Sequence, residues 1–393
     1  MDKIQVIIVG GGAAGLMAAI TAASNGAGVT VLEQNDNPGR KICVTGNGRC
    51  NLTNKDMRPE YFRGDNADFV KKILEQFSTD DTLRFFENLG MKFTDRNGWI
   101  YPRSNQAKSV VELMLLRARY LKVKIKTREK VEKIYCENNK WFVKTSGWCY
   151  EADKVILANG SSASQVPGSD GSGYALAREL GHRIIKPLPA LTGLKCKGNY
   201  FSAWAGVRTD ASIKLIIDDN FVSEEKGELQ LTDYGISGIP VFQLSRFALR
   251  ALDAGNRVEV LINFFPEYTL EELNRLLDIR RQNCPYQSEK ELLIGLIPEK
   301  LINVLKKDKT FIERLTSFRL EIKGSTGIEQ AQVASGGVDT TQLNNETLES
   351  LLHKGLYFAG EIIDIDGPCG GYNLQWAWSS GEVAGLACTK ENI

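Results

Sequence analysis

The sequence has few of the residues that hold metals or build catalytic triads. Only two histidines, His182 and His353, occur among 393 residues. The eight cysteines are scattered, with no C-x-x-C pair, and their spacing fits neither a zinc site nor a disulfide framework. We therefore expect no metal, no histidine-based site and no Ser-His-Asp triad. Unpaired cysteines of this kind predict a reduced, cytoplasmic protein.

Long apolar runs and an excess of one charge are also missing. No run approaches the roughly 20 apolar residues of a spanning helix, and the N-terminus leads straight into an apolar strand pattern without the features of a signal peptide. The 49 Lys and Arg residues nearly balance the 48 Asp and Glu residues, which leaves a net charge of +1. This balance favours neither a nucleic acid nor a membrane surface as partner, so we expect a small-molecule substrate.

The N-terminal stretch determines the predicted fold. Residues 4–9 are apolar and β-branched, which is typical of a strand buried on both faces. Residues 16–23 are rich in alanine and leucine and predict a closely packed helix, and residues 29–32 predict a second buried strand. A strand, a helix and a second strand in this order predict a βαβ unit of an α/β fold.

A glycine pattern lies between the first strand and the helix. Gly10, Gly12 and Gly15 fit G-x-G-x-x-G, and the second strand ends at Glu33. The glycines let the backbone approach a pyrophosphate at the helix N-terminus, and an acid about 20 residues further on can accept a hydrogen bond from a ribose. Together these features predict a dinucleotide site.

A second loop, at residues 42–54, is rich in glycine and asparagine and predicts irregular backbone. Arg40 and Lys41, immediately before this loop, and Arg49 within it offer charge to a diphosphate. Asn51 and Thr53 offer hydrogen bonds. A solvated turn is the alternative interpretation.

Two further buried strands are predicted downstream, at residues 154–158 and 356–359. The first ends at a tight turn, Asn159-Gly160-Ser161, and the second is followed by Gly360 and Glu361. A helix then begins near Tyr372, after two glycines. Its N-terminus would offer free backbone N–H groups and a positive dipole end, and these are the electrostatics suited to the negatively charged N1–C2=O edge of a reduced flavin.

The middle of the chain has a different composition. After Pro187-Leu188-Pro189, residues 191–265 consist of short β-like runs, and residues 231–240 look like a glycine-rich turn region. Residues 269–316 are helical and rich in Leu, Lys and Glu.

These motifs resemble a group of bacterial three-domain, BaiN-type FAD flavoproteins that includes a streptococcal aminoacetone oxidase. The resemblance rests on the first motif, GRKICVTGNGRCNLTN, ILANGSSASQVPGSDGSGY and YFAGEIIDIDGPCGGYNLQWA. It implies an α/β, glutathione-reductase-like FAD domain of the Rossmann type (residues 1–190 and 338–393). It also implies an inserted β-barrel-like domain (residues 191–265 and 317–337) and a helical domain (residues 266–316).

The resemblance implies bound FAD, held by residues from every motif, and we expect this binding to be noncovalent. Including the dinucleotide glycines, the expected cofactor residues are Gly10, Gly12, Ala13, Ala14, Gly15, Glu33, Gln34, Arg40, Lys41, Gly46, Cys50, Asn51, Leu52, Thr53, Val131, Ala158, Asn159, Gly160, Gly360, Glu361, Asp364, Gly371, Tyr372, Asn373 and Leu374. Val131 is expected at the adenine. Two positions depart from the group. Many relatives have Thr-Gly-Gly where this chain has Ala158-Asn159-Gly160, and relatives often have Thr at the position of Cys369. We expect inert packing for Cys369.

No second G-x-G-x-x-G for NAD(P)H occurs in residues 186–350, and Cys43 and Cys50 lack the C-x4-C spacing of disulfide reductases. We therefore expect an oxidase of a small primary amine such as aminoacetone, with hydride transfer to flavin N5 and reoxidation by O2 to give H2O2. The alternative is an NAD(P)H-dependent reductase of an unsaturated or keto substrate, and a flavin-dependent RNA-modifying protein is a third class. No catalytic residue is identified. Tyr101, Tyr234 and Trp376 are candidates for lining the site.

Overall fold

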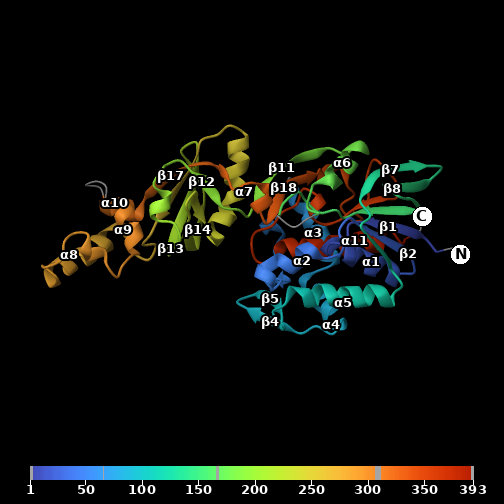
Figure 1. Ribbon diagram of the computed structural model, residues 1–393, viewed down its shortest axis with the longest axis horizontal. Coiled ribbons are helices and arrows are strands. Elements are labelled where there is room, and N and C mark those ends of the chain that lie inside the picture. The colour runs from blue at the N-terminus through green and yellow to red at the C-terminus, as the bar shows by residue number, and fades with distance from the viewer. Residues whose placement is uncertain (1–2, 65, 165–167, 306–310, 391–393) are drawn as a thin grey trace. The chain divides into compact units, whose positions relative to one another are not determined.

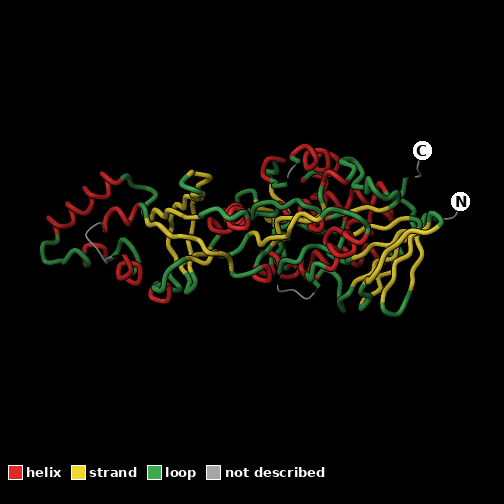
Figure 2. The backbone as a smooth tube through the Cα atoms, turned by 90° about the horizontal axis from the view of Figure 1, so that it is seen from above, coloured by secondary structure: helices red, strands yellow, loops and turns green. Residues whose placement is uncertain are grey.

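The computed structural model describes residues 3–64, 66–164, 168–305 and 311–390. The chain forms two compact units, which we call unit 1 (Met1–Pro187 and Val333–Ile393) and unit 2 (Leu188–Gln332). Figures 1 and 2 show the elements of both. The division into three domains stays a prediction. Residues 306–310 of the predicted helical domain and residues 165–167 of the third motif lie outside the described residues.

Unit 1 is built on a five-stranded sheet with the order β19-β10-β1-β2-β6. All four pairings are parallel. The strands are β1 (Gln5–Val9), β2 (Gly28–Glu33), β6 (Lys124–Thr127), β10 (Lys154–Leu157) and β19 (Leu356–Phe358). The central strands β1 and β10 are buried along almost their whole length, which agrees with their uninterrupted apolar sequences.

The register brings the carboxyl ends of four strands to one edge of this sheet. Val9 of β1 pairs with Leu157 of β10 and with Leu32 of β2, and Leu157 pairs with Phe358 of β19. The loops after β1, β2, β10 and β19 therefore leave the sheet side by side. Ligands of open α/β sheets bind at this edge.

Two helices pack closely in unit 1. They are α1 (Ala13–Ser24) and α11 (Tyr372–Ala387). Glycine on α11 permits the contact, because a Cβ on Gly381 would lie 2.5 Å from the Ala14 carbonyl oxygen. The helices α2 (Arg40–Val44), α3 (Ala67–Gln76), α4 (Thr79–Asn88), α5 (Ala107–Tyr120) and α6 (Ser172–Glu179) complete the described helices of this unit. Of these, α2 occupies the start of the loop that we predicted to be irregular.

Three small sheets accompany the main one. One contains β3 (Thr53–Asn54), β5 (Trp99–Pro102) and β4 (Phe93–Arg96), in that order. Another contains β7 (Val131–Glu137), β8 (Lys140–Thr145) and β9 (Cys149–Ala152). The strands β11 (Ile184–Ala190) and β18 (Val333–Val338) form a pair where the chain leaves and re-enters unit 1.

Unit 2 contains a closed barrel with the strand order β12-β15-β14-β13-β16-β17. Its strands are β12 (Leu194–Cys196), β13 (Arg208–Ile217), β14 (Asn220–Leu231), β15 (Gly235–Ser237), β16 (Val258–Asn263) and β17 (Phe318–Ser325). The helices among its described residues are α7 (Ile239–Asp253), α8 (Leu270–Asn283), α9 (Glu299–Leu305) and α10 (Phe311–Thr316).

The helix α7 was not predicted from the sequence, because its apolar and polar residues were interpreted as part of a β-like region. Pro240 lies in the first turn of this helix, where proline is tolerated since the missing N–H has no partner there. The region that looked like a glycine-rich turn therefore contains β15 and the start of α7. Among the described residues, no helix is long and apolar enough to cross a membrane.

Candidate cofactor site

The glycine loop between β1 and α1 is tightly packed at two of its three motif positions. A Cβ on Gly10 would lie 2.4 Å from the Ala158 carbonyl oxygen, and a Cβ on Gly15 would lie 1.9 Å from the Gly10 carbonyl oxygen. Gly10 has φ +105°, which disfavours a side chain. These two glycines therefore bring β1, α1 and the loop after β10 into backbone contact.

Gly12 is different, because a Cβ there would meet no atom within 4 Å. Gly12 is the N-cap of α1 and has no side-chain capping hydrogen bond, and no acid occurs in the first turn. The first N–H groups of a helix have no intrahelical partner and carry a positive partial charge. The space beside Gly12 therefore fits an anion, and a pyrophosphate is the anion that this motif accommodates.

Glu33, at the end of β2, holds the neighbouring loop in place. Its carboxylate accepts hydrogen bonds from the Gly11 N–H (2.8 Å), the Asn35 N–H (2.8 Å) and the Asn35 side-chain amide (2.7 Å). Gln34 donates to the Gly168 carbonyl oxygen at 2.7 Å. Glu33 thus orders the glycine loop, and its contact with a ribose stays a prediction.

An ion pair joins the loops that follow β2 and β19. The Lys41 ammonium lies 2.6 Å from a Glu361 carboxylate oxygen, and the Ser161 hydroxyl donates to the same oxygen at 3.0 Å. Lys41 and Glu361 are both expected cofactor residues, whereas Ser161 was noted only as part of the turn after β10. Arg40, beside Lys41, is exposed and lies 3.4 Å from the Asn35 side-chain oxygen.

The second loop is buried from Cys50 to Asn54. Cys50 has φ +59°, and burial raises the pKa of its thiol to about 12, so this thiol is not poised to react. With its amide oriented to donate, Asn51 reaches the Ile100 and Thr53 carbonyl oxygens at 3.3 and 3.1 Å. The Leu52 carbonyl oxygen accepts a hydrogen bond from the Trp378 indole at 3.0 Å.

Gln375 links this loop to α11. It is fully buried, and its side-chain oxygen accepts a hydrogen bond from the Thr53 hydroxyl at 2.6 Å. Its nitrogen donates to the hydroxyls of Thr82 (2.8 Å) and Ser379 (2.9 Å). Gln375 was not among the expected site residues, because no local sequence signature marks it: α11 also carries Asn373, Ser379 and Glu382.

The N-terminus of α11 lies directly against the second loop. A Cβ on Gly371, the N-cap, would lie 2.6 Å from the Thr53 carbonyl carbon. The Asn373 side chain accepts a hydrogen bond from the Gly367 N–H and donates to the Gly367 carbonyl oxygen, both at 2.8 Å. Tyr372 donates to the Asp56 carbonyl oxygen at 3.0 Å. Gly360 packs on α1, because its Cβ would lie 2.8 Å from the Ala14 Cβ.

Four chain segments that were predicted to share one cofactor thus contact one another in unit 1. The remaining expected residues take different positions. Val131 is buried in the separate β7-β8-β9 sheet, and Asp364 is buried, with its N–H donating to the Val338 carbonyl oxygen at 3.0 Å. Ala13, Asn159, Gly160, Gly46 and Leu374 lie in the loops and helix starts described above. Contacts between individual residues and a cofactor stay predictions.

The three candidates for lining the substrate site lie in different environments. Trp376 is 1% exposed and packs against Phe62 and Phe69, so it is a core residue. Tyr101 is mostly buried beside the second loop, where a Cβ on Gly46 would lie 3.7 Å from its ring. Tyr234 belongs to unit 2.

This fold and this arrangement of loops define a dinucleotide-binding α/β protein with an additional barrel. Residues 4–387 match the model of the HI0933-like protein Rossmann domain, and the chain belongs to that family. The chain is an FAD-dependent oxidoreductase, and FAD is its cofactor. The space at Gly12, the α1 N-terminus and Glu33 fit that group.

Two relatives have names that describe a reaction. The chain is 43% identical to the 3-dehydro-bile acid delta(4,6)-reductase of Clostridium scindens, across 99% of this chain and 100% of the relative. It is 29% identical to the ribosomal RNA dihydrouridine synthase of Escherichia coli, across 100% of this chain and 99% of that protein. The 3-ketosteroid-delta4-(5alpha)-dehydrogenase of Rhodococcus jostii has a similar fold, with a TM-score of 0.54, 13% identity and coverage of 99% of this chain and 97% of that structure.

These comparisons correct the predicted reaction. The expectation of an amine oxidase is wrong, because the relative that is 43% identical over its entire length is a reductase. O2 as the electron acceptor is likewise not supported. The inference failed because it treated a missing second nucleotide-binding motif as evidence against a reductase. The relative aligns over its full length, so a reductase of this family needs no additional domain beyond those in the present chain.

Proposed function

We propose that the protein is an FAD-dependent reductase of a carbon–carbon double bond conjugated to a ketone in a steroid-like small molecule. The observation that supports this most directly is the 43% identity over the full chain to a 3-dehydro-bile acid delta(4,6)-reductase. That name describes a 3-keto substrate with unsaturation at positions 4 and 6. In its reduced form, bound FAD supplies hydride chemistry. NADH or NADPH is the proposed source of the electron pair.

The chain's own residues have defined tasks in this proposal. The glycine loop and the α1 N-terminus hold the pyrophosphate, and Glu33 holds the adenosine ribose. The ion pair between Lys41 and Glu361, with Ser161 on the same oxygen, fixes the positions of three loops around the cofactor. One hydride adds to the carbon of a conjugated double bond that is farther from the ketone, and one proton adds to the other carbon of the same bond. Each such step removes one double bond and retains the ketone.

Reduction of uridine in ribosomal RNA is the second candidate. It is favoured by the two dihydrouridine synthases, from Haemophilus influenzae and E. coli, which are 28% and 29% identical over at least 98% of this chain. Dihydrouridine is uridine whose ring double bond, conjugated to a carbonyl, has been reduced, so the bond chemistry is the same. The lower identity and the net charge of +1 favour the small molecule.

The test is an anaerobic assay of the FAD-loaded enzyme with NADH or NADPH and a 3-keto-4,6-diene bile acid. We expect loss of the ultraviolet absorbance of the dienone and a product that mass spectrometry shows to carry additional hydrogen. The matched control is the saturated 3-keto bile acid, which should not react. If the diene is unchanged while an undermodified ribosomal RNA gains dihydrouridine, the steroid proposal is wrong and the RNA alternative replaces it.

A further inference from the structure

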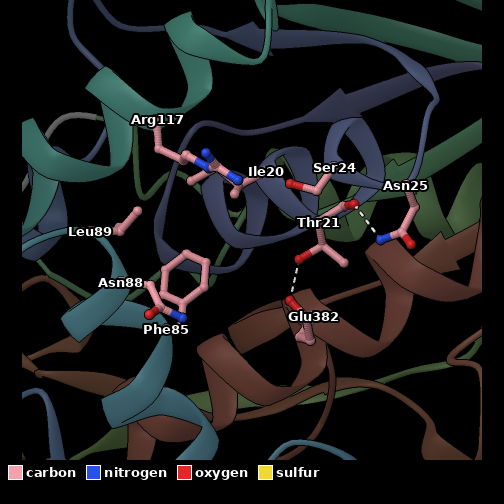
Figure 3. Close-up of a pocket in the computed structure, with 9 residues that line it drawn as sticks. All are labelled: Ile20, Thr21, Ser24, Asn25, Phe85, Asn88, Leu89, Arg117 and Glu382. Carbon is pink, nitrogen blue, oxygen red and sulfur yellow. Dashed lines mark hydrogen bonds between the residues drawn. The ribbon is translucent and has the colours of Figure 1, made fainter.

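A cavity of about 440 Å³ lies in unit 1 among α1, α4, α5 and α11 (Figure 3). Its walls come largely from the last turns of three helices, and one residue of α11 completes it. The lining residues are Ile20, Thr21, Ser24, Asn25, Phe85, Asn88, Leu89, Arg117 and Glu382. None of them belongs to the proposed cofactor site.

One side of this cavity has a negative electrostatic potential. The Glu382 carboxylate accepts a hydrogen bond from the Thr21 hydroxyl, and among the described residues it forms no ion pair. Burial raises the pKa of Glu382, and the nearby charge of Asp81 acts in the same direction. The C-terminal turns of α1 and α4 add the negative ends of two helix dipoles. These groups together favour a bound cation over an empty cavity.

Another wall carries a positive charge. Arg117 lies in the last turn of α5, and within the described part of the chain its guanidinium has no carboxylate partner. Its one described partner is the ring of Tyr120, whose centroid lies 5.4 Å away. An arginine in this state can bind a carboxylate through two hydrogen bonds.

The third wall is apolar. Ile20, Phe85 and Leu89 contribute side chains from α1 and from the end of α4 (Figure 3). The cavity therefore combines an unpaired carboxylate, an unpaired guanidinium and a hydrophobic surface, and its volume is in the range of sites for small ligands.

We propose that this cavity binds a free α-amino acid with an apolar side chain. The ligand's ammonium group contacts Glu382, its carboxylate contacts Arg117, and its side chain packs against Phe85 and Leu89. A ligand with only an ammonium group would leave Arg117 without an anionic partner, and a ligand with only a carboxylate would leave Glu382 without a cationic partner. A zwitterion is therefore preferred over a simple amine or a simple acid.

The experiment is isothermal titration calorimetry of the FAD-loaded protein with L-leucine. The comparison ligands are isopentylamine, which lacks the carboxylate, and 4-methylpentanoate, which lacks the ammonium group. We expect L-leucine to bind and each comparison ligand to bind at least about tenfold more weakly, since each loses a charge-assisted contact. Absence of L-leucine binding, or equal binding of either comparison ligand, would overturn the proposal.

Two variants locate the site. Arg117→Gln and Glu382→Gln keep the helix propensity and roughly the shape of each side chain, and the amide oxygen introduced by Glu382→Gln would still accept the Thr21 hydrogen bond. Each should weaken L-leucine binding by about tenfold or more. Arg119→Gln, on the same helix but outside the cavity, should leave binding unchanged. The visible flavin spectrum reports whether each variant is folded, and unchanged affinity in both cavity variants would place any observed binding elsewhere.

Discussion

The Lys41 ammonium and the Glu361 carboxylate lie 2.6 Å apart although 320 positions separate them in the chain. Their side chains are 26% and 18% exposed, so the pair is partly shielded from water. Lys41 belongs to α2, after the end of β2, and Glu361 follows β19 at the far end of the sheet order. This contact, together with Ser161, ties the two outer loops of the proposed cofactor site to the turn after β10.

Replacing Lys41 should therefore lower stability and FAD affinity, whereas replacing the lysine of an exposed ion pair should not. In Lys41→Met, the partly buried Glu361 carboxylate loses its cation. We expect unfolding free energy to fall by about 1–2 kcal/mol, between the values typical of exposed and of buried pairs. We also expect FAD affinity to fall, because the loops are less constrained. Urea unfolding and FAD titration of the apoprotein measure the two effects.

The matched control for this variant is Lys55→Met. Lys55 also pairs with a carboxylate, Asp95, at 2.7 Å, but the two side chains are 61% and 41% exposed. Its loss should change neither stability nor FAD affinity measurably. Equal effects of the two lysine variants would show that the Lys41 pair has no special role.

Gly12 offers a way to remove the cofactor without unfolding the chain. Its φ of −81° and ψ of −164° are accessible to any residue, and a Cβ there meets nothing within 4 Å. We expect Gly12→Val to fold with near-normal stability and to purify without the yellow colour of FAD. Gly15→Val should instead be strongly destabilised, because its Cβ would clash with the Gly10 carbonyl oxygen. A yellow, fully loaded Gly12→Val protein would contradict the proposed pyrophosphate position.

The sequence predicted the parts of the site that depend on local patterns. The glycine motif, Glu33 and the helix after Gly371 each have a signature within a short window, and the resemblance added FAD. Ser161 and Gln375 had no such signature, since their importance depends on partners 200 and 322 positions away. The helix α7 was missed because its apolar residues lie in a region dominated by strands. The reaction was missed because the source of flavin electrons leaves no obligatory motif.

Gln375 should be important for stability. Leucine at this position would leave the Thr53 and Thr82 hydroxyls without their buried partner. An unsatisfied buried polar group typically costs about 1–3 kcal/mol, so we expect Gln375→Leu to lower the unfolding free energy by about 2–4 kcal/mol. Urea unfolding of the FAD-free protein measures this. Gln76→Leu is the control, because Gln76 forms exposed hydrogen bonds to Lys72 and Glu346 carbonyl oxygens and should change stability by less than about 0.5 kcal/mol.

His182 should make the stability depend on pH. It is 2% exposed, and burial lowers its pKa from 6.5 to about 4, with a further contribution from the charge of His353. The folded protein therefore holds His182 neutral, whereas the unfolded chain binds a proton below about pH 6.5. By linkage, the stabilisation is complete above about pH 6.5 and is lost as the pH falls towards 4. At about 1.4 kcal/mol for each tenfold change in proton affinity, this change in pKa corresponds to at most about 3 kcal/mol across this window.

The pH profile of His182→Gln separates this residue from all others that titrate in acid. His182 shares a hydrogen bond of 2.9 Å with the Ser350 hydroxyl, and glutamine can maintain a hydrogen bond there without titrating. We expect the unfolding free energy of this variant to vary less between pH 4 and 6.5 than that of the parent protein. His353→Gln removes the only other histidine in the sequence and should leave most of the slope in place, because the burial of His182 is unchanged. Parallel profiles for the parent and His182→Gln would mean that other groups, chiefly carboxylates, account for the acid sensitivity.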